Sequence, residues 1–538
     1  MLDQSFSFEN FRIILDVENR KGKYLENDKL FVDNDIFRES REITDKKIEL
    51  NKLITLEFKK LPKKNLRKKE DYKIIDDLYL EKEKLEKERE NCLEKILIEL
   101  SQKTNIDNYK IEIKKGQIKY GSQLYTVENK PEHFFVLKQL QRNIYKTFKV
   151  KQASRKNIIS QLKLILDDNF PKIIIRTDIE SFYETIPHKE LLSKIDENSL
   201  LSYPSKKIIK DILNQYWKIL INDGVKNIND ERVGLPRGIG ISAYLSELYM
   251  RNFDKKIATY SNVTYYCRYV DDIIIVITPE NRNENKSILN YKTELKNIVT
   301  KSTMLNINSS KTSFTDLRKE NKERKISKDY ELTYLGYKFI ISYKKKTNDK
   351  KIILENIPSK LIKNQDKLKS YNDKITANPS EYSLNLIKQV PKDYIEKQPL
   401  RILMSDDKFE RYIKKIKSSF KDFKLEKAKY TSNHNGINRI LLQRIRFLTN
   451  NFQLLRRKDN VFVGVYYSNE FINDFSNLTE LDKILQIEVT AITAIAKDTL
   501  IDKLQKLSFH KGFKEKSFLK FNFRAFQNDK VLKIWKNL

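Results

Sequence analysis

Two predicted strand regions of the chain end in carboxylates. Residues 263–269 alternate and are rich in Tyr, Val and Thr, and residues 273–278 are almost wholly β-branched, so both are predicted to be strands. Asp271 and Asp272 lie between them, at the expected tip of a hairpin. Residues 173–175 lack polar alternation, which is typical of a strand buried on both faces. Asp178 stands where that strand would emerge from the core.

Helical spacing of apolar residues dominates the rest of the chain. Residues 71–102 show one narrow apolar face among many Glu and Lys residues, as in an amphipathic helix. Residues 111–120 alternate and indicate a hairpin, and the basic stretch 341–352 predicts a hinge between domains. Further helices are predicted over residues 136–148, 153–166, 241–257, 439–455 and 481–507.

The adjacent carboxylates suggest a metal site. Burying like charges side by side is unfavourable unless something neutralises them, and carboxylate oxygens suit Mg²⁺. The alternative is a solvent-exposed turn, in which Asp is common. The second acidic strand end, at Asp178, favours the metal interpretation. Two metals held between strand ends can clamp the attacking and leaving oxygens of a phosphoryl transfer.

Five short motifs in a fixed order extend this interpretation. They are Asp178, the stretch GLPRGIGIS at residues 234–242, Tyr269-Val270-Asp271-Asp272, Lys311 after Leu-Asn-Ile-Asn, and Leu335-Gly336. In this order and spacing, residues 115–345 resemble a reverse transcriptase. Each motif is weak alone, but the chance of several matches in register is small.

The resemblance implies a chemical role for several residues. Asp178, Asp271 and Asp272 would be catalytic and would bind Mg²⁺ or Mn²⁺ together with the backbone carbonyl of Ile179. Lys311 would protonate the leaving pyrophosphate, with an ordinary surface lysine as the alternative.

Other residues would bind the nucleotide or the primer. Tyr183 would lie under the sugar and exclude a 2′-hydroxyl, unless it is an ordinary buried tyrosine, and Leu335 with Gly336 would form the primer grip. The remaining nucleotide-binding candidates are Arg237, Gly238, Ser242, Arg142, Lys151 and Arg155.

The chain departs from the family pattern within the glycine-rich motif. Arg237 stands where the family commonly has glutamine, and Ala243 where it commonly has proline. Because that glutamine helps to hold nucleotide and template, the substitution leaves template use and primer choice open.

Composition indicates a nucleic-acid partner and no membrane span. The 538 residues carry 106 basic and 74 acidic side chains, a net charge of +32 that favours polyanionic partners. An AT-rich genome accounts for many lysines but not for the excess over acidic residues. No apolar run of about 18 residues occurs. Two cysteines far apart in sequence, Cys92 and Cys267, predict reduced core residues in a cytoplasmic protein.

The predicted fold class is α+β, with an antiparallel polymerase palm and fingers and helical additions at both ends. The predicted domains are a charged helical extension over residues 1–110, fingers over 111–177, a palm over 178–345 and a helical domain over 346–538 in place of the usual thumb. That combination resembles bacterial "unknown group" and abortive-infection reverse transcriptases, which act in antiviral defence.

The predicted function is RNA-directed DNA synthesis from deoxynucleoside triphosphates, with RNA template or DNA product as partner. The defence-type resemblance also implies homo-oligomers, and in some members synthesis without an added template from a protein primer. Two alternatives therefore stay open: a template-independent DNA polymerase of the same fold, and a catalytically idle nucleic-acid-binding protein.

Overall fold

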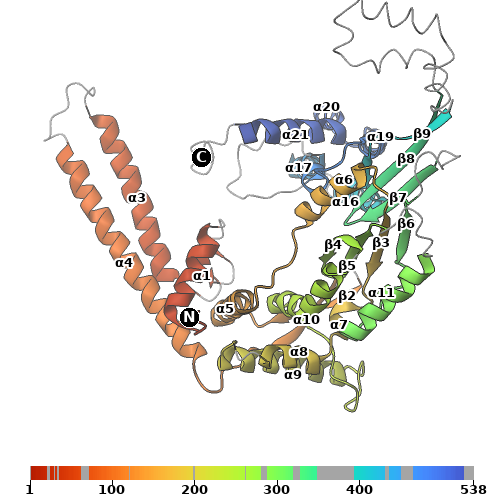
Figure 1. Ribbon diagram of the computed structural model, residues 1–538. Helices are drawn as coiled ribbons and strands as arrows, with labels where there is room; N and C mark the ends of the chain where they lie inside the picture. The colour runs from red at the N-terminus through yellow and green to blue at the C-terminus, as the bar shows by residue number, and fades with distance from the viewer. Residues whose placement is uncertain are drawn as a thin grey trace, which may run out of the picture.

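A four-stranded antiparallel sheet forms the centre of the protein (Figure 1). The computed structural model describes residues 2–525 apart from 21–24, 29–30, 33–34, 62–71, 120, 198–199, 261, 280–287, 319–327, 348–392, 430–434 and 450–463. The strand order is β4 (Val263–Tyr269), β5 (Asp272–Ile277), β3 (Ile173–Asp178) and β6 (Ser313–Asp316). The α+β fold class predicted from the sequence is confirmed.

The two faces of this sheet pack into two different cores. Ile173, Ile175 and Ile273 point into one core, whereas Ile174 and Ile274 point into the other. Successive strand residues face opposite sides of a sheet, so both faces require apolar side chains. This double burial explains the unbroken isoleucine runs of β3 and β5.

Helices and a hairpin from residues 113–303 cover the first face. Short helix α7 (Phe182–Thr185) follows β3, and the hairpin of β1 (Ile113–Lys119) and β2 (Ser122–Val127) packs nearby. The longer helices are α5 (Pro131–Phe148), α8 (His188–Asp196), α9 (Tyr203–Asn222), α10 (Gly240–Ala258) and α11 (Ile288–Thr303).

The N-terminal region is a helical hairpin that stands away from the sheet (Figure 1). Its long helices α3 (Arg38–Lys60) and α4 (Lys73–Thr104) share a small cluster of Leu50, Ile54 and Ile75. At its base, α1 (Phe8–Arg20) and the short helix η1 (Leu25–Asn27) join the first core, where Phe11 stacks on Phe135.

A second sheet and the C-terminal helices cover the other face. The strands are β7 (Lys328–Tyr334), β8 (Tyr337–Thr347), β9 (Asp393–Lys397) and β10 (Arg401–Met404), and β8 pairs with the other three. The helices are α6 (Arg155–Asp167), α16 (Asp406–Lys429), α17 (Asn435–Thr449), α18 (Val465–Ser468), α19 (Ser476–Thr490), α20 (Asp498–Gln505) and α21 (Phe509–Ala525).

Two local predictions were wrong. Residues 341–347 are not a hinge but the second half of β8, because Ile341, Ser342 and Tyr343 are buried and the strand pairs with β7 and β9. The remainder of that predicted hinge, residues 348–352, lies outside the described residues. The predicted helix over 481–507 is two helices, α19 and α20, separated by a series of tight turns.

Within the described residues, no helix is both long and apolar enough to cross a membrane. Cys92 and Cys267 are free thiols.

Candidate active site

The register of the central sheet brings Asp178 and Asp272 to directly opposite positions on β3 and β5. Asp271 lies in the tight turn before β5, next to Val270, whose φ of +61° is in the left-handed region. The Ile179 N–H donates to the Asp271 carbonyl oxygen at 3.3 Å and ties this turn to the end of β3. Three carboxylates from distant parts of the sequence are thus brought to one end of the sheet.

The three carboxylates are held in a desolvated, electrostatically unfavourable arrangement. Burial raises the pKa of Asp271, and the nearby charge of Asp178 adds to this effect. Burial together with the charge of Asp271 raises the pKa of Asp272 to about 6. Such shifts indicate that the group lacks full charge compensation, which is typical of functional sites.

Lys311 is in direct contact with this acidic group. Its Nζ atom donates to Asp178 Oδ2 at 2.8 Å, and this hydrogen bond raises the pKa of the ammonium group. The Asn308 amide lies 3.5 Å from the same carboxylate oxygen, and the Asn308 backbone N–H donates to the Asp178 carbonyl. Sequence reasoning identified Lys311 but missed Asn308, which precedes it by three residues in the same loop.

The donor set suits a hard divalent cation. Three carboxylates supply only oxygen ligands, and the raised pKa values of Asp271 and Asp272 indicate that added positive charge would relieve their repulsion. Among the residues that the structure describes, no group of three His, Cys, Asp or Glu side chains is arranged so that it could hold a metal ion. The three aspartates fit the ion by the chemistry of their oxygen atoms and not by a preformed ligand geometry.

The glycine-rich motif forms a turn packed against the fingers hairpin. Gly238 has a φ of +98°, and a Cβ atom there would lie 2.6 Å from the Tyr125 carbonyl oxygen, so only glycine fits without a backbone shift. Ser242 is buried and its hydroxyl donates to the Pro236 carbonyl at 2.7 Å. Both residues, predicted to bind nucleotide, thus have a clear structural role in shaping this turn.

Arg237 projects from this turn toward Tyr183. Its Nε and Nη2 atoms donate to the two carboxylate oxygens of Glu184 at 2.5 and 3.0 Å, and its Cζ atom lies 5.1 Å from the centre of the Tyr183 ring. Arg237 is one of the cations that lower the pKa of Asp271 against the effect of burial. Sequence reasoning missed Glu184, although its position beside Tyr183 and the unusual arginine together were the available signal.

The predicted cations of the fingers lie at separate positions. Arg142 donates to the Asn10 side chain at 3.0 Å, and Lys151 is exposed. Arg155 donates through Nε and Nη2 to the Leu335 carbonyl at 3.0 and 2.5 Å. The structure thus brings Arg155 to the predicted primer grip, and the main cations that act on Asp271 and Asp272 are Arg237, Arg176 and Lys311.

Leu335 and Gly336 form the tight turn between β7 and β8, both at positive φ. Tyr334, just before this turn, donates its hydroxyl to the Asp272 carbonyl at 3.1 Å, so the hairpin contacts the strand that carries the carboxylates. Lys408 from α16 lies 5.1 Å from the centre of the Tyr337 ring, on which Arg155 also packs. Burial, followed by the charge of Arg155, lowers the pKa of Lys408 to about 7.

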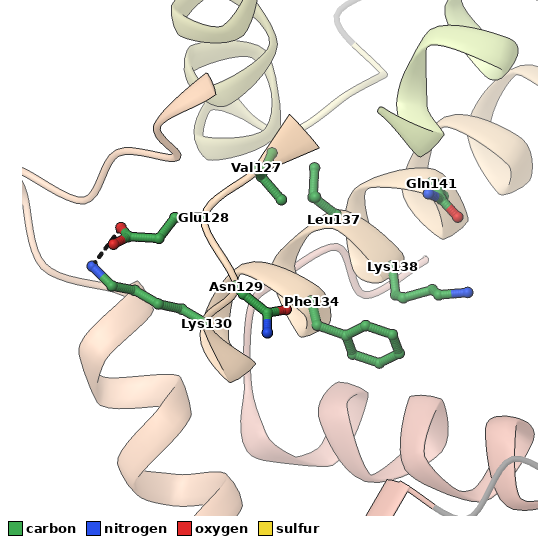
Figure 2. A pocket seen from close by; sticks show the side chains of 8 residues that line it. All are labelled: Val127, Glu128, Asn129, Lys130, Phe134, Leu137, Lys138 and Gln141. Atoms are coloured by element: carbon green, nitrogen blue, oxygen red, sulfur yellow. Dashed lines mark ion pairs between the residues drawn. The ribbon is translucent and has the colours of Figure 1, made fainter. Parts of the chain in front are cut away.

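A pocket of about 230 Å³ lies between the end of β2 and helix α5 (Figure 2). Its wall includes Phe134, Leu137 and Lys138, and an ion pair of 2.8 Å joins Glu128 to Lys130 at its rim. None of the residues predicted from the sequence to act in catalysis lines it. The pocket is therefore separate from the carboxylate site.

The central antiparallel sheet, with carboxylates at one end, has the arrangement of a polymerase palm, and a comparison with known families agrees for this part of the chain. Residues 130–339 match the family model described as reverse transcriptase (RNA-dependent DNA polymerase). The matched residues therefore form a reverse transcriptase domain, which includes Asp178, Asp271 and Asp272.

Among solved structures, a telomerase from Candida albicans in complex with a TWJ fragment of telomeric RNA is similar, with 11% identity and a TM-score of 0.31. The alignment covers 69% of this chain and 56% of the telomerase chain. No curated protein matches the sequence.

Proposed function

We propose that the protein is an RNA-directed DNA polymerase whose reaction centre consists of Asp178, Asp271 and Asp272. A primer hydroxyl attacks the α-phosphate of a deoxynucleoside triphosphate, a phosphodiester bond forms and pyrophosphate leaves. The observation that carries this proposal is the pairing of Asp178 with Asp272 across two buried strands, with Asp271 in the adjoining turn. The reverse transcriptase match spans all three residues.

Asp178, Asp271, Asp272 and the carbonyl oxygen of Ile179 are the proposed ligands of Mg²⁺ or Mn²⁺. When bound, the metal would supply charge stabilisation for the attacking and leaving oxygens. The unfavourable crowding of these carboxylates supports this assignment, because a site that repels its own charges gains most from a cation.

Other side chains have proposed roles in orientation and proton transfer. Lys311 forms an ion pair with Asp178, and its largely exposed ammonium group donates a proton to the leaving pyrophosphate. Tyr183 presents its ring beneath the sugar, and the Leu335–Gly336 turn supports the primer end. Arg237, Arg142, Lys151 and Arg155 remain candidates for binding triphosphate or template phosphates, since guanidinium and ammonium groups suit phosphate oxygens.

A second candidate is template-independent synthesis by the same centre, with a protein hydroxyl as primer. The observation that favours it is the bidentate pairing of Arg237 with Glu184. The side chain at this family position is engaged with the protein itself, where the common glutamine would be free to contact a templated base pair.

The biological role that we propose is antiviral defence in a bacterial cytoplasm, in an oligomeric form. Its support is the combination of sequence features: a long helical N-terminal region, the Pro-Arg-Gly variant of the glycine-rich motif and a largely helical C-terminal region. Light scattering of the purified protein tests the oligomer. Survival of a phage-challenged host that expresses the chain tests the role.

The polymerase proposal is tested by nucleotide incorporation with the full chain and Mg²⁺ or Mn²⁺. Three reactions are compared: a primed RNA template, a primed DNA template and no added nucleic acid. We expect RNA-dependent product from the wild type and none from the Asp271→Asn, Asp272→Asn double variant. The matched control, Asp107→Asn, changes an exposed carboxylate and should leave the rate unchanged.

Each other outcome has a distinct meaning. Homopolymer formation without nucleic acid supports the second candidate. An unchanged rate in the double variant refutes the assignment of the reaction centre. If the protein binds nucleic acid but incorporates no nucleotide under any condition, the result supports the alternative of a catalytically idle nucleic-acid-binding protein.

A further inference from the structure

A carboxylate, a guanidinium group and an aromatic ring form a stack beside the catalytic aspartates. Glu184 and Tyr183 are neighbours in α7, and Arg237 comes from the glycine-rich turn. The guanidinium group of Arg237 donates two hydrogen bonds to the Glu184 carboxylate. Its Cζ atom lies 5.1 Å from the centre of the Tyr183 ring. Arg237 is thus held by two adjacent residues of one short helix.

The geometry of this contact fixes the orientation of the guanidinium group. Two parallel N–H···O hydrogen bonds define the plane of an arginine fork, whereas one bond would let it rotate. A cation facing an aromatic ring is also attracted by the ring quadrupole. The carboxylate of Glu184 therefore sets the position of Arg237 over Tyr183.

The Tyr183 ring is held by further contacts. Phe182 packs edge-on with a centroid distance of 5.4 Å, and the Tyr183 ring is partly buried against the first core. Arg237 adds a contact from the glycine-rich turn. Without the guanidinium group, the ring would lose one of the contacts that define its position.

The backbone of this region does not depend on the Glu184–Arg237 pair. The Leu235 N–H donates to the Tyr183 carbonyl at 2.7 Å, and the Gly234 N–H donates to the Ile186 carbonyl at 2.7 Å. The Arg237 carbonyl accepts a hydrogen bond of 2.6 Å from the Tyr125 N–H. The side chains of Arg237 and Glu184 are 30% and 42% exposed, so their ion pair contributes little to stability. A role in the site is the better account of the pair.

We propose that Glu184 is a positioning residue that holds Arg237 over Tyr183 and thereby sets how strictly deoxynucleotides are selected over ribonucleotides. This inference rests on the proposed function, because it needs Tyr183 beneath the sugar of the incoming nucleotide. A ring that is free to tilt leaves room for a 2′-hydroxyl, whereas a fixed ring clashes with it.

The test measures kcat/KM for a deoxynucleotide and the matching ribonucleotide with the full-length protein. We expect Glu184→Gln, which keeps the shape but loses the charge, to lower the deoxy-to-ribo ratio about tenfold by admitting the ribonucleotide. The kcat for the deoxynucleotide should change less than about threefold, because no reacting group is removed. Glu184→Asp keeps the charge and should restore part of the selectivity.

Two controls separate positioning from a general loss of structure. Glu231→Gln alters an exposed carboxylate in the segment before the same turn and should leave the ratio unchanged. In a Tyr183→Ala background, Glu184→Gln should have no further effect on the ratio, because the group it acts through is gone.

The proposal is overturned if Glu184→Gln keeps the wild-type ratio, or if it lowers the ratio equally in the Tyr183→Ala background. If the wild-type enzyme is active and selects deoxynucleotides, either result refutes only the role of Glu184 and does not contradict the proposed polymerase function. A wild type that incorporates no nucleotide refutes both proposals, which the incorporation assay reveals beforehand.

Discussion

Two buried charge clusters lie on the same β4–β5 hairpin and differ in how well their charges are balanced. Near the end of β4, Arg268 is almost fully buried and pairs with Glu247 and Asp254, each at 2.7 Å. A few residues further on, Asp271 and Asp272 share the sheet end with Asp178. The cations that act on them are Arg237, Arg176 at 3.8 Å from Asp272, and Lys311, which pairs with Asp178.

The difference separates a structural cluster from the proposed reaction centre. A buried charge with complete partners stabilises one conformation, whereas a group of carboxylates with incomplete partners is left to attract a cation. The structural cluster also supports the functional one, because Arg268 Nη1 donates to the Val270 carbonyl at 2.8 Å in the turn before Asp271.

The largest effect on stability is expected from breaking the balanced cluster. Arg268→Met removes the buried cation that pairs with Glu247 and with the partly exposed Asp254, and it should cost about 3–5 kcal/mol of unfolding free energy. Urea titration measures this loss. The matched change Arg251→Met removes an exposed arginine of α10 and should alter stability by less than about 0.5 kcal/mol. A loss below about 1 kcal/mol for Arg268→Met would contradict the comparison.

An intermediate effect on stability is expected at a third cluster, which has an excess of positive charge. Arg155 and Lys408 both lie against Tyr337 and the Gly336 turn, and Arg411 adds further positive charge. The charges that act on the pKa of Lys408 are both positive, those of Arg155 and Arg411. Unfolded Lys408 keeps its proton up to pH 10.5, whereas in the folded protein it loses the proton near pH 7. Between these values the unfolded state binds more protons, so stability rises with pH.

Lys408→Met removes the titrating lysine and should therefore weaken the dependence of stability on pH. Between pH 7 and 9 we expect the wild type to gain up to about 2 kcal/mol more than the variant. Urea titrations at both pH values measure the difference, and Lys414→Met, an exposed change on α16, should behave like the wild type. Parallel pH profiles for wild type and Lys408→Met would show that the lysine is not desolvated.

The smallest effect is a gain of stability when the unbalanced cluster is neutralised. Asp271→Asn with Asp272→Asn removes two crowded charges and should stabilise the metal-free protein by about 1–2 kcal/mol. Added Mg²⁺ should then raise the melting temperature of the wild type and not of the double variant, because only the former gains binding energy. A double variant that is less stable than the wild type, or that responds equally to Mg²⁺, would contradict the proposed metal site.

The sequence predicted those parts of the molecule that depend on local patterns. Continuous isoleucine runs identified β3 and β5, and the acidic residues at their ends identified the carboxylate site. Glu184 was missed because its partner Arg237 lies 53 residues away, so the contact shows only when the residue beside Tyr183 is considered together with the unusual arginine. Asn308 was missed for the same reason, since its contact with Asp178 is made across the sheet.

The other two wrong predictions arose from a run of charged residues and from the absence of helix-breaking residues. The lysines of residues 344–346 resemble a solvated linker, yet the preceding alternation of Ile341 and Tyr343 continues a strand. The turn between α19 and α20 contains neither glycine nor proline, so a continuous helix was the natural prediction.

The pairing of β10 with β8 has a consequence for how this protein can evolve. Residues 401–404 hydrogen-bond to residues 337–340, so the strand that follows the Gly336 turn is completed by a segment from the C-terminal region. A recombination event that joined a different C-terminal region just after β8 would leave backbone N–H and C=O groups of β8 unpaired, unless that region supplied an equivalent strand. Palm and C-terminal region are therefore expected to be inherited together, as one unit of descent.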